Sequence, residues 1–212
     1  MVRGQALGLS VTGRCHVARY GKEHKEATRQ RIIDTAGRRF KKDGIDRSGV
    51  ATLMADAGLT NGAFYAHFDS KDDLVATVLG DQLGRQASDF SRLPGGRAGL
   101  EVFVREYLSP AHRDHRDVGC PSAALLDDVG RCTAATKKAY TAGAKAVLNE
   151  ISRRLAPEDP DSARATALLL FTMLVGSMQL ARALSDRKLS NAVLEQGIHS
   201  AQAILDASRT AR

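Results

Sequence analysis

The chain has 212 residues, of which 43% are hydrophobic and 26% charged, values typical of a globular protein and not of a disordered one. It contains no run of about 18 to 20 continuous apolar residues, so no membrane-spanning helix and no membrane partner are expected. The formal net charge of +7 is uneven, with 13 Lys and Arg against 8 Asp and Glu in residues 1–72 and 18 against 16 in residues 73–212, which favours a polyanion such as nucleic acid as the partner of the amino-terminal third.

Residues 1–22 contain several glycines and scattered arginines without apolar periodicity, so we expect a flexible amino-terminal extension. This segment lacks the long apolar core of a secretory signal, which predicts a cytoplasmic protein. The three cysteines, Cys15, Cys120 and Cys132, are odd in number and far apart, as expected for free thiols in a reducing compartment.

Helical spacing begins at Lys25, and the apolar positions of one face follow as Ala27, Ile32, Ile33, Ala36 and Phe40. Gly44 is suited to end this helix in the left-handed conformation. Ser48 is a candidate cap for a second helix, which buries Leu53 and Met54 and stops at Gly58. Thr60 is a candidate cap for a short third helix through His67, and Ser70 for a fourth with Asp72 and Asp73 in its first turn.

This order of a long helix, two short helices and another long helix over residues 23–72 and beyond is the outline of a helix-turn-helix DNA-binding unit. In the third helix, small or amide side chains come first and rings follow. Phe64 and Phe68 are four residues apart, so they share a face and anchor the helix, while the leading turn enters the major groove. We expect base contacts from Asn61, Gly62 and Ala63 and phosphate contacts from Tyr65, His67 and Lys71, with Ser48, Thr52 and Thr60 as further DNA-binding candidates.

The segment "RQRIIDTAGRRFKKDGIDRSGVATLMADAGLTNGAFYAHFDSKDDLVATVL" resembles the amino-terminal domain of the TetR family of bacterial repressors. The resemblance rests on Phe40 with Gly44, on the Ala57-Gly58 turn, and on the motif formed by Tyr65, His67, Phe68 and Lys71. It implies an all-α homodimer in which a three-helix DNA-binding domain joins a larger helical ligand-binding and dimerisation domain, and it implies the same base and phosphate contacts. "GVA" at 49–51 departs from the polar residues that many relatives have at the start of the second helix.

Residues 73–212 are predicted to form that larger domain. Helical segments are expected at 97–108, 121–130, 133–155, 161–185 and 189–207, separated by "RLPGG", Pro110, "APEDP" and "SDRKLS". No sustained period-two alternation is present, so the sequence predicts no sheet.

Cys120 precedes Pro121, which suits the first turn of a helix, so Cys120 is expected at a helix amino terminus, where the dipole favours a thiolate. It is a candidate sensor of electrophiles or oxidants, or alternatively a small packing residue. An effector pocket is expected to be lined by Phe103, Tyr107, Cys120, Ala124, Phe171 and Met173, although the same stripe suits plain core. His112 and His115 lack further convergent ligands and are expected in a surface loop without metal.

The segment 161–185 is apolar on more than one face, so it is expected to meet both its own core and a second subunit. With the last helix it would form a four-helix interface about a twofold axis. The expected interface residues are Leu169, Thr172, Gly176, Leu180, Val193 and Gly197.

The sequence therefore predicts a repressor that a small-molecule effector releases from a palindromic double-stranded DNA operator, with no cofactor and no enzymatic activity. Two other functions stay open at this point: an architectural DNA-binding protein without effector, which would coat DNA with little sequence preference, and an all-α enzyme with Cys120 as nucleophile, which needs a nearby histidine base.

Overall fold

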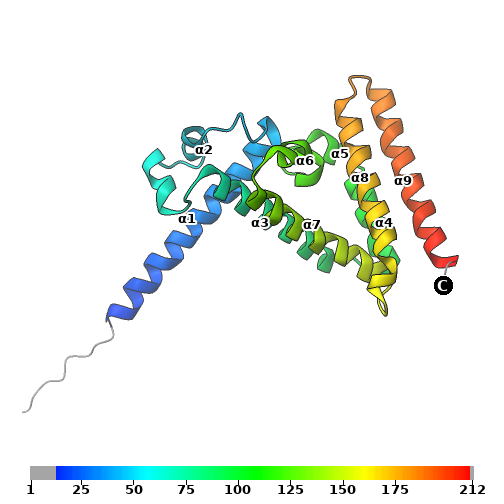
Figure 1. Ribbon diagram of the computed structural model, residues 1–212, viewed down its shortest axis with the longest axis horizontal. Helices are drawn as coiled ribbons and strands as arrows, with labels where there is room; N and C mark the ends of the chain where they lie inside the picture. Colours follow the sequence, from blue (N-terminus) through cyan, green and yellow to red (C-terminus); the bar gives the residue numbers. More distant parts are fainter. Residues whose placement is uncertain (1–12, 211–212) are drawn as a thin grey trace, which may run out of the picture.

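The computed structural model describes the backbone of residues 13–210 and the side chains of residues 22–208. This part of the chain is helical and contains no strand (Figure 1), which confirms the predicted all-α class. The α-helices and the short 3₁₀ helices, labelled η, are α1 (Gly13–Asp43), α2 (Val50–Asp56), η1 (Asn61–Ala66), α3 (Lys71–Asp89), η2 (Phe90–Arg92), α4 (Gly96–Tyr107), α5 (Pro110–Asp114), α6 (Pro121–Arg131), α7 (Ala134–Leu155), η3 (Pro160–Ala163), α8 (Arg164–Ala183) and α9 (Arg187–Thr210).

The first helix begins earlier than the sequence pattern indicates. We expected an irregular extension through residue 22, but the backbone is already helical from Gly13. Adding residues to an existing helix costs much less than starting one, so a polar segment without apolar periodicity can continue a helix that packing stabilises further along. The rest of the predicted extension, residues 1–12, lies outside the described residues.

The end of α1 is as predicted, whereas the start of α2 is not. Gly44 has φ +91° and its amide donates to the Phe40 carbonyl at 2.8 Å, so the chain leaves the helix through a conformation that favours glycine. The residue that caps α2 is Gly49, and Ser48 was the wrong choice. The Ser48 hydroxyl is fully buried and donates to the Gly44 carbonyl at 2.8 Å, because the turn folds it back toward the end of α1.

The predicted recognition helix is a 3₁₀ helix and not an α-helix. Ala63 donates to the Thr60 carbonyl and His67 donates to the Phe64 carbonyl, three residues back in each case. These i to i−3 bonds define η1 over its six residues, and the i to i−4 bond from the Phe68 amide to the Phe64 carbonyl follows at its end. Thr60 occupies the expected cap position, but its side chain makes no capping hydrogen bond.

The later boundaries follow the sequence closely. Ser70 accepts from the Asp73 amide at 3.1 Å and caps α3 as predicted, and the five helices expected beyond residue 96 are present as α4, α6, α7, α8 and α9. The short helix α5 was not predicted. Its cap is Ser109, which accepts from the His112 amide at 3.1 Å, and Pro110 stands in its first turn.

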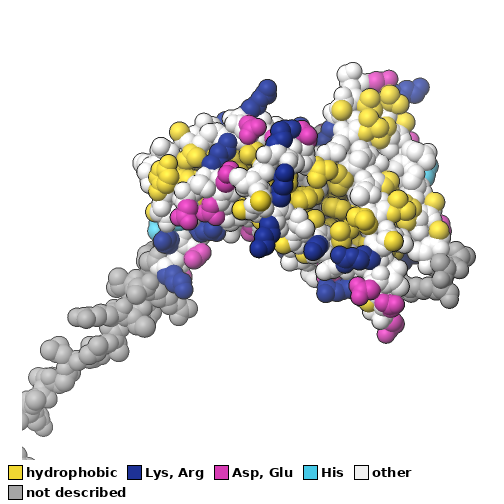
Figure 2. Space-filling view, in the orientation of Figure 1, with side chains coloured by type: hydrophobic (Ala, Val, Ile, Leu, Met, Phe, Trp, Pro, Cys, Tyr) yellow, Lys and Arg dark blue, Asp and Glu magenta, His cyan; other side chains and the backbone are white. Residues whose placement is uncertain are grey.

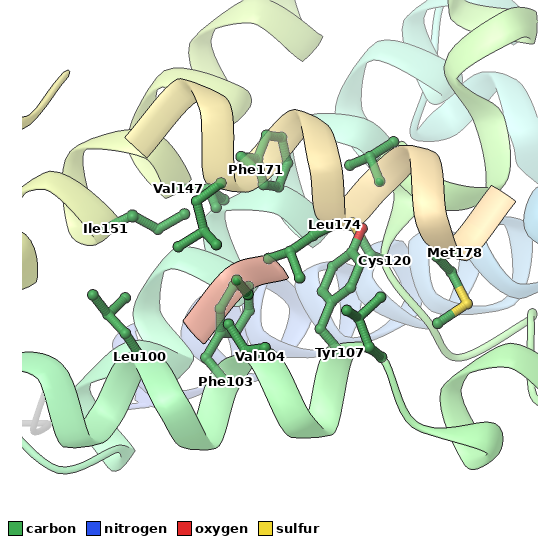
Figure 3. Packing of buried hydrophobic residues seen from close by; sticks show 14 of the residues in the cluster. Leu100, Phe103, Val104, Tyr107, Cys120, Val147, Ile151, Phe171, Leu174 and Met178 are labelled. Carbon is green, nitrogen blue, oxygen red and sulfur yellow. The ribbon is translucent and has the colours of Figure 1, made fainter. Parts of the chain in front are cut away.

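Two clusters of buried apolar side chains hold the helices together. The amino-terminal cluster joins α1, α2, η1 and the first half of α3 to α6, and its α6 members are Ala124, Leu125 and Val129. The carboxyl-terminal cluster joins α4, α7, α8 and α9 to the end of α3 (Figure 3). We call α1, α2, η1 and α3 the head and α4 to α9 the body. Helix α3 of the head packs along α7 of the body (Figure 1), so it connects the two clusters.

Helix α8 is the most apolar element. The segment Pro160–Ala183 is long and apolar enough, by length and composition alone, to cross a membrane, and 39% of its most apolar window is buried inside the molecule. One face packs into the carboxyl-terminal cluster, where Leu170, Leu174 and Met178 have no exposed surface. The apolar character of that face is therefore explained by the core of this chain.

Candidate nucleic-acid interface and internal cavity

Two buried phenylalanines fix η1 to the head. Phe64 and Phe68 are 1% and 2% exposed, and their ring centroids lie 5.7 Å apart. The Arg29 guanidinium of α1 lies 4.6 Å from the centre of the Phe68 ring, a cation–π contact that adds to the packing. The rings thus clamp one side of η1 against α1, as the spacing of four residues predicts.

The opposite side of η1 is open. Asn61 and Gly62 are exposed at its leading end, and Ala63 is half-buried. A Cβ atom added at Gly62 would meet no atom within 4 Å, so the surface at this position is unobstructed. These three residues form the accessible leading end of η1, whose other side packs against the rest of the head.

The three residues predicted to contact phosphate differ in solvent exposure. Tyr65 is 71% exposed and stands edge-on to Phe64, with 5.3 Å between ring centroids. Lys71 is half-buried at the first position of α3. His67 is also half-buried, and its Nδ1 has no hydrogen-bond partner among the described residues. Burial, followed by the charges of Lys25 and Arg29, lowers the pKa of His67, so its ring is neutral near pH 7.

The remaining DNA-binding candidates divide into accessible and inaccessible ones. Thr52 on α2 and Thr60 before η1 are exposed. Ser48 is the correction: its side chain has no exposed surface and its hydroxyl is already bonded to Gly44, so it supports the turn and offers nothing to a ligand.

A cavity of about 850 Å³ lies between the head and the body, bounded by α1, α3, α4 and the residues from α5 to the start of α6. This volume is within the range of small-molecule sites. One end is lined by apolar side chains, Phe90, Leu93 and Phe103, and the other by the polar side chains of Lys41, Tyr107, His112 and Cys120.

Three of the six residues predicted for the effector pocket line this cavity. Phe103, Tyr107 and Cys120 line the cavity, whereas Ala124, Phe171 and Met173 do not. Ala124 belongs to the amino-terminal cluster, and Phe171 and Met173 pack in the carboxyl-terminal cluster. Helical spacing shows which residues share a face, but it does not show which part of that face a neighbouring helix covers.

His112 is a further correction, since it lies in α5 and not in a surface loop. Its Nε2 accepts from the Cys120 amide at 3.0 Å, and its Nδ1 lies 2.6 Å from the Tyr107 carbonyl. An imidazole that accepts at Nε2 must carry its proton at Nδ1, so the ring donates to Tyr107 and is neutral. Burial lowers the pKa of His112, which agrees with this assignment. His115 is exposed, and its Nδ1 lies 2.9 Å from the Ala111 carbonyl.

Cys120 immediately precedes Pro121 at the amino terminus of α6, as predicted. Cys120 is 7% exposed, and its thiol is free. The half-buried Cys132, at the other end of the same helix, is also free. No side-chain oxygen caps the amino terminus of α6. The described residues contain no group of three or more His, Cys, Asp and Glu side chains arranged to hold a metal ion.

Two cations lie near this end of the cavity, the buried Lys41 and the half-buried Arg182, and the sequence pattern did not predict either. Lys41 of α1 is only 4% exposed and donates to the Gly119 carbonyl at 2.9 Å. Arg182 of α8 donates to the carbonyls of His112, at 2.7 Å, and Ala123, at 3.0 Å. A lysine in the last turn of a helix is ordinarily solvated, so nothing in the local pattern indicates that Lys41 is buried.

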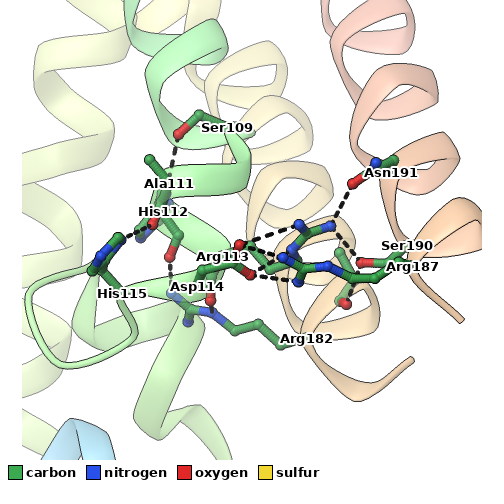
Figure 4. A network of polar contacts seen from close by, with 11 residues as sticks. Ser109, Ala111, His112, Arg113, Asp114, His115, Arg182, Arg187, Ser190 and Asn191 are labelled. Carbon is green, nitrogen blue, oxygen red and sulfur yellow. Dashed lines mark hydrogen bonds and ion pairs between the residues drawn. The ribbon is translucent and has the colours of Figure 1, made fainter. Parts of the chain in front are cut away.

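A network of polar contacts fixes α5 to α9 (Figure 4). The buried Arg113 guanidinium donates to Ser190 Oγ at 2.8 Å and pairs with Asp114 at 2.9 Å. Arg187 at the start of α9 holds the other side of Asp114 with two hydrogen bonds of 2.7 Å. These bonds hold His112, the neighbour of Arg113, at the cavity wall.

An exposed apolar stripe runs along α8. Leu168, Leu169 and Leu180 are 51%, 55% and 53% exposed, and Figure 2 shows hydrophobic side chains at the surface of this part of the molecule. Thr172 and Gly176 are exposed on the same helix.

The two candidates on α9 face inward. Val193 is half-buried against the carboxyl-terminal cluster, and Gly197 is buried. A Cβ atom at Gly197 would lie 2.8 Å from Leu108 Cδ1 and 3.2 Å from Ser177 Oγ, so this glycine serves the packing of α9 within its own chain. Its predicted place at the surface between subunits is therefore wrong.

Comparison with known proteins identifies the amino-terminal part of the chain. Residues 32–78 match the model of the bacterial regulatory proteins of the tetR family. The HTH-type transcriptional regulator TtgR of Pseudomonas putida is 41% identical over 63 residues, which is 30% of this chain and 30% of the relative. The residues matched by the family model include α2 and η1, and the match to TtgR covers less than a third of the relative's length.

The likeness to solved structures extends further along the chain. The reduced form of NemR from E. coli matches with a TM-score of 0.71 and 18% identity, covering 84% of this chain and 96% of that one. FadR from Bacillus subtilis in complex with stearoyl-CoA matches with a TM-score of 0.59 and 18% identity, covering 80% and 97%. At this level of identity the likeness shows the fold: an amino-terminal helix-turn-helix domain followed by a helical body.

Proposed function

We propose that this chain, whose residues 32–78 match the model of the bacterial regulatory proteins of the tetR family, is a member of that family and acts as a dimeric transcriptional repressor that a small-molecule effector releases from a palindromic DNA operator. The observation that carries the proposal is the geometry of η1. Two buried rings hold it in place while its leading end, Asn61 and Gly62, is bare. An unobstructed helix end backed by a rigid core is what entry into the major groove requires.

We assign the contacts by chemistry. The Asn61 amide can make a bidentate pair with adenine, and the backbone at Gly62 can approach the base edges closely. Tyr65 and the neutral ring of His67 can donate to phosphate oxygens, and the Lys71 ammonium adds a charge at the start of α3. Thr52 and Thr60 are also exposed and supply further polar contacts.

We propose that two copies associate through the exposed stripe of α8. Three leucines that are each more than half exposed on one helix form a surface that water solvates poorly, and burying them against a second copy removes it. A twofold dimer carries two η1 helices, so its operator should consist of two half-sites about one DNA turn apart, roughly 34 to 36 Å.

We place the effector in the cavity between head and body. Helix α1 contributes part of the wall, through Asp34, Arg38 and Lys41, so a molecule bound there touches the same helix that supports η1. An effector that binds more tightly when the two heads are spread lowers operator affinity, and a coupling free energy of about 1 to 3 kcal/mol corresponds to roughly 5- to 150-fold. The fold accommodates an organic ligand in at least one relative, FadR, whose structure contains stearoyl-CoA. A regulator of this kind acts on DNA in the cytoplasm, where we place this protein.

Selection of binding sites from random double-stranded DNA, followed by footprinting, tests the proposal. We expect a palindromic consensus and one dimer per site, with a protected region that spans both half-sites. Uniform coating of DNA without a consensus would instead indicate an architectural protein, and a monomer that protects a single half-site would contradict the proposed dimer.

A further inference from the structure

The polar end of the cavity contains more positive than negative charge. Lys41 Nζ has no carboxylate oxygen of the described residues within 4.0 Å, and its hydrogen bond is to the Gly119 carbonyl. The Arg182 guanidinium likewise donates to backbone carbonyls, those of His112, Arg113 and Ala123. Both cations are thus held by neutral oxygens, an arrangement that leaves their charge without a full counter-ion.

The acidic groups nearby do not cancel this charge. Asp117, which lines the cavity, acts on Lys41 from a distance but makes no ion pair with it. At the other end of the cavity, Asp34 pairs with Arg85 at 2.8 Å and Asp89 pairs with Arg92 at 2.9 Å. Asp34 and Asp89 are thus neutralised by their own arginines. Glu106 and Asp117 also line the cavity and make no ion pair with Lys41, and the cations Lys41, Arg38 and Arg182 outnumber these two acids.

A buried hydroxyl that lacks a nitrogen or oxygen partner lies at the same place. Tyr107 is 4% exposed and lines the cavity, and among the described residues its Oη makes no hydrogen bond to nitrogen or oxygen, although it interacts with the Cys120 thiol, a weak partner. Figure 3 shows the ring rising from α4 with its oxygen beside Cys120. A buried hydroxyl without a strong partner costs free energy that a bound acceptor would recover. The uncapped amino terminus of α6 adds a positive partial charge on the same side.

We propose that this end of the cavity binds the carboxylate of a small organic acid, with Lys41 as its counter-ion and the Tyr107 hydroxyl as a donor, while the apolar part of the acid lies against Phe90 and Phe103. The inference deepens the proposed function and rests on it only for its regulatory meaning, since it names the class of effector. A carboxylate accepts several hydrogen bonds and carries one negative charge, which matches one ammonium, one hydroxyl and no paired acid.

The position of Lys41 gives the ligand a direct route to the head. Lys41 belongs to the last turn of α1, whereas Gly119 precedes α6 of the body, so their hydrogen bond joins the two units. A carboxylate beside Nζ competes with the Gly119 carbonyl for the ammonium protons. The acid would therefore act on the contact between α1 and α6 itself.

The test compares two probes of the same shape by isothermal titration calorimetry on the full chain without DNA: 3-phenylpropionate and its neutral analogue 3-phenylpropionamide. We expect the acid to bind roughly tenfold to a hundredfold more tightly than the amide, as a charged hydrogen-bonded contact does. Equal binding of the two probes, or binding of neither, overturns the proposal. Inorganic phosphate binding as tightly as the acid overturns the role given to the apolar end.

Two variants test whether Tyr107 and Lys41 cause the preference for the acid over the amide. Tyr107→Phe removes only a hydroxyl that makes no hydrogen bond to nitrogen or oxygen of the described residues, so the fold should be little affected and the affinity for the acid should fall roughly threefold to tenfold. Lys41→Met should abolish the preference for the acid over the amide. Tyr140→Phe is the matched control, because its hydroxyl bonds to Ser122 and does not line the cavity; an equal loss in that variant contradicts the assignment.

The dependence on pH gives a second readout. Burial lowers the pKa of Lys41 to about 8, while Cys120, Asp117, Arg182 and Arg38 face it from the loop before α6, from α8 and from α1. The ammonium is lost as the pH rises through this value, so the affinity for the acid should fall between about pH 7 and 9 in the wild type and in Cys120→Ser, and stay flat in Lys41→Met. A flat wild-type profile contradicts the proposed counter-ion. These measurements contain no DNA, so their failure is distinct from a failure to find an operator.

Discussion

The Arg113 guanidinium donates to Asn191 Oδ1 at 2.7 Å, although 78 residues separate the two in the chain. Together with Ser190 and Asp114, Asn191 occupies the donors of a side chain that is almost fully buried. The bond joins α5, which is only five residues long, to the start of α9. A helix of this length is unstable alone. Its position at the cavity wall therefore depends on these long-range hydrogen bonds.

Replacing Arg113 by methionine should therefore destabilise the fold. We expect the free energy of unfolding to fall by about 2 to 4 kcal/mol, since hydrogen bonds to a buried charge are each worth roughly 1.5 to 3 kcal/mol and the apolar side chain recovers only part of the loss. Urea unfolding followed by circular dichroism measures the change. Arg187→Met is the control: this side chain is 66% exposed, and its loss should cost less than about 1 kcal/mol. Equal costs in both variants would contradict the importance assigned to burial.

Asn61 and Lys71 should differ in the kind of DNA affinity they supply. Asn61→Ala should relax base preference at one position in each half-site and cost about 1 to 3 kcal/mol on the selected operator. Lys71→Ala should weaken binding to all sequences alike and reduce the slope of log affinity against log salt by about one. Fluorescence anisotropy at several salt concentrations separates the two. Unchanged preference and identical slopes in both variants would remove these roles.

Gly58 and Gly62 allow stability and DNA approach to be separated. Gly58 has φ +67°, so Gly58→Ala should destabilise the head by about 1 to 2 kcal/mol through backbone strain. Gly62 has no positive φ, and no atom would lie near a new Cβ, so Gly62→Ala should leave the melting temperature almost unchanged and still weaken operator binding by about 1 kcal/mol or more. Normal operator affinity in Gly62→Ala would show that the backbone there does not approach the bases.

Two half-buried histidines should make the fold less stable in mild acid. Burial lowers the pKa of both His112 and His67 from the ordinary value of 6.5, so the unfolded chain binds more protons than the folded chain below that pH. The stability that the neutral rings contribute is present above pH 6.5 and is lost as the pH falls below it. His112→Gln should show a shallower decline in unfolding free energy between about pH 7 and 5, and His112→Gln/His67→Gln a shallower one still. Parallel curves of unfolding free energy against pH for the wild type and the two variants would show that these histidines do not cause the decline.

A charge on the exposed face of α8 should separate the proposed dimer. Leu180→Glu places a carboxylate at the carboxyl-terminal end of the stripe, where burial against a second copy would remove its hydration at a large cost. We expect a monomer with an unchanged helical spectrum by sedimentation velocity. Leu126→Glu, at a 40% exposed leucine of α6, is the control and should stay dimeric. Loss of association in both variants would point to a different interface.

Much of the head was accessible to sequence reasoning because its signals are local. Gly44 adopts a conformation that glycine favours, Ser70 bonds three residues ahead, and Phe64 and Phe68 share a face through a spacing of four. Each depends on residues within one helical turn, so the pattern alone identifies it. Ser48 shows the limit even here, since the fold of the turn, and not the residue type, decided that its hydroxyl points back to Gly44.

The sequence by itself determined the all-helical class, the helix-turn-helix order and most helix boundaries, because these follow from apolar period, caps and breakers along the chain. Only the tertiary structure decided that α5 exists, that Lys41 is buried against Gly119, and that His112, Tyr107 and Cys120 meet at one end of a cavity. The physical reason is that burial and partnership depend on which helix covers which face. Contacts such as those of Lys41 with Gly119 and of Arg113 with Asn191 join residues nearly 80 positions apart, and no local pattern contains that information.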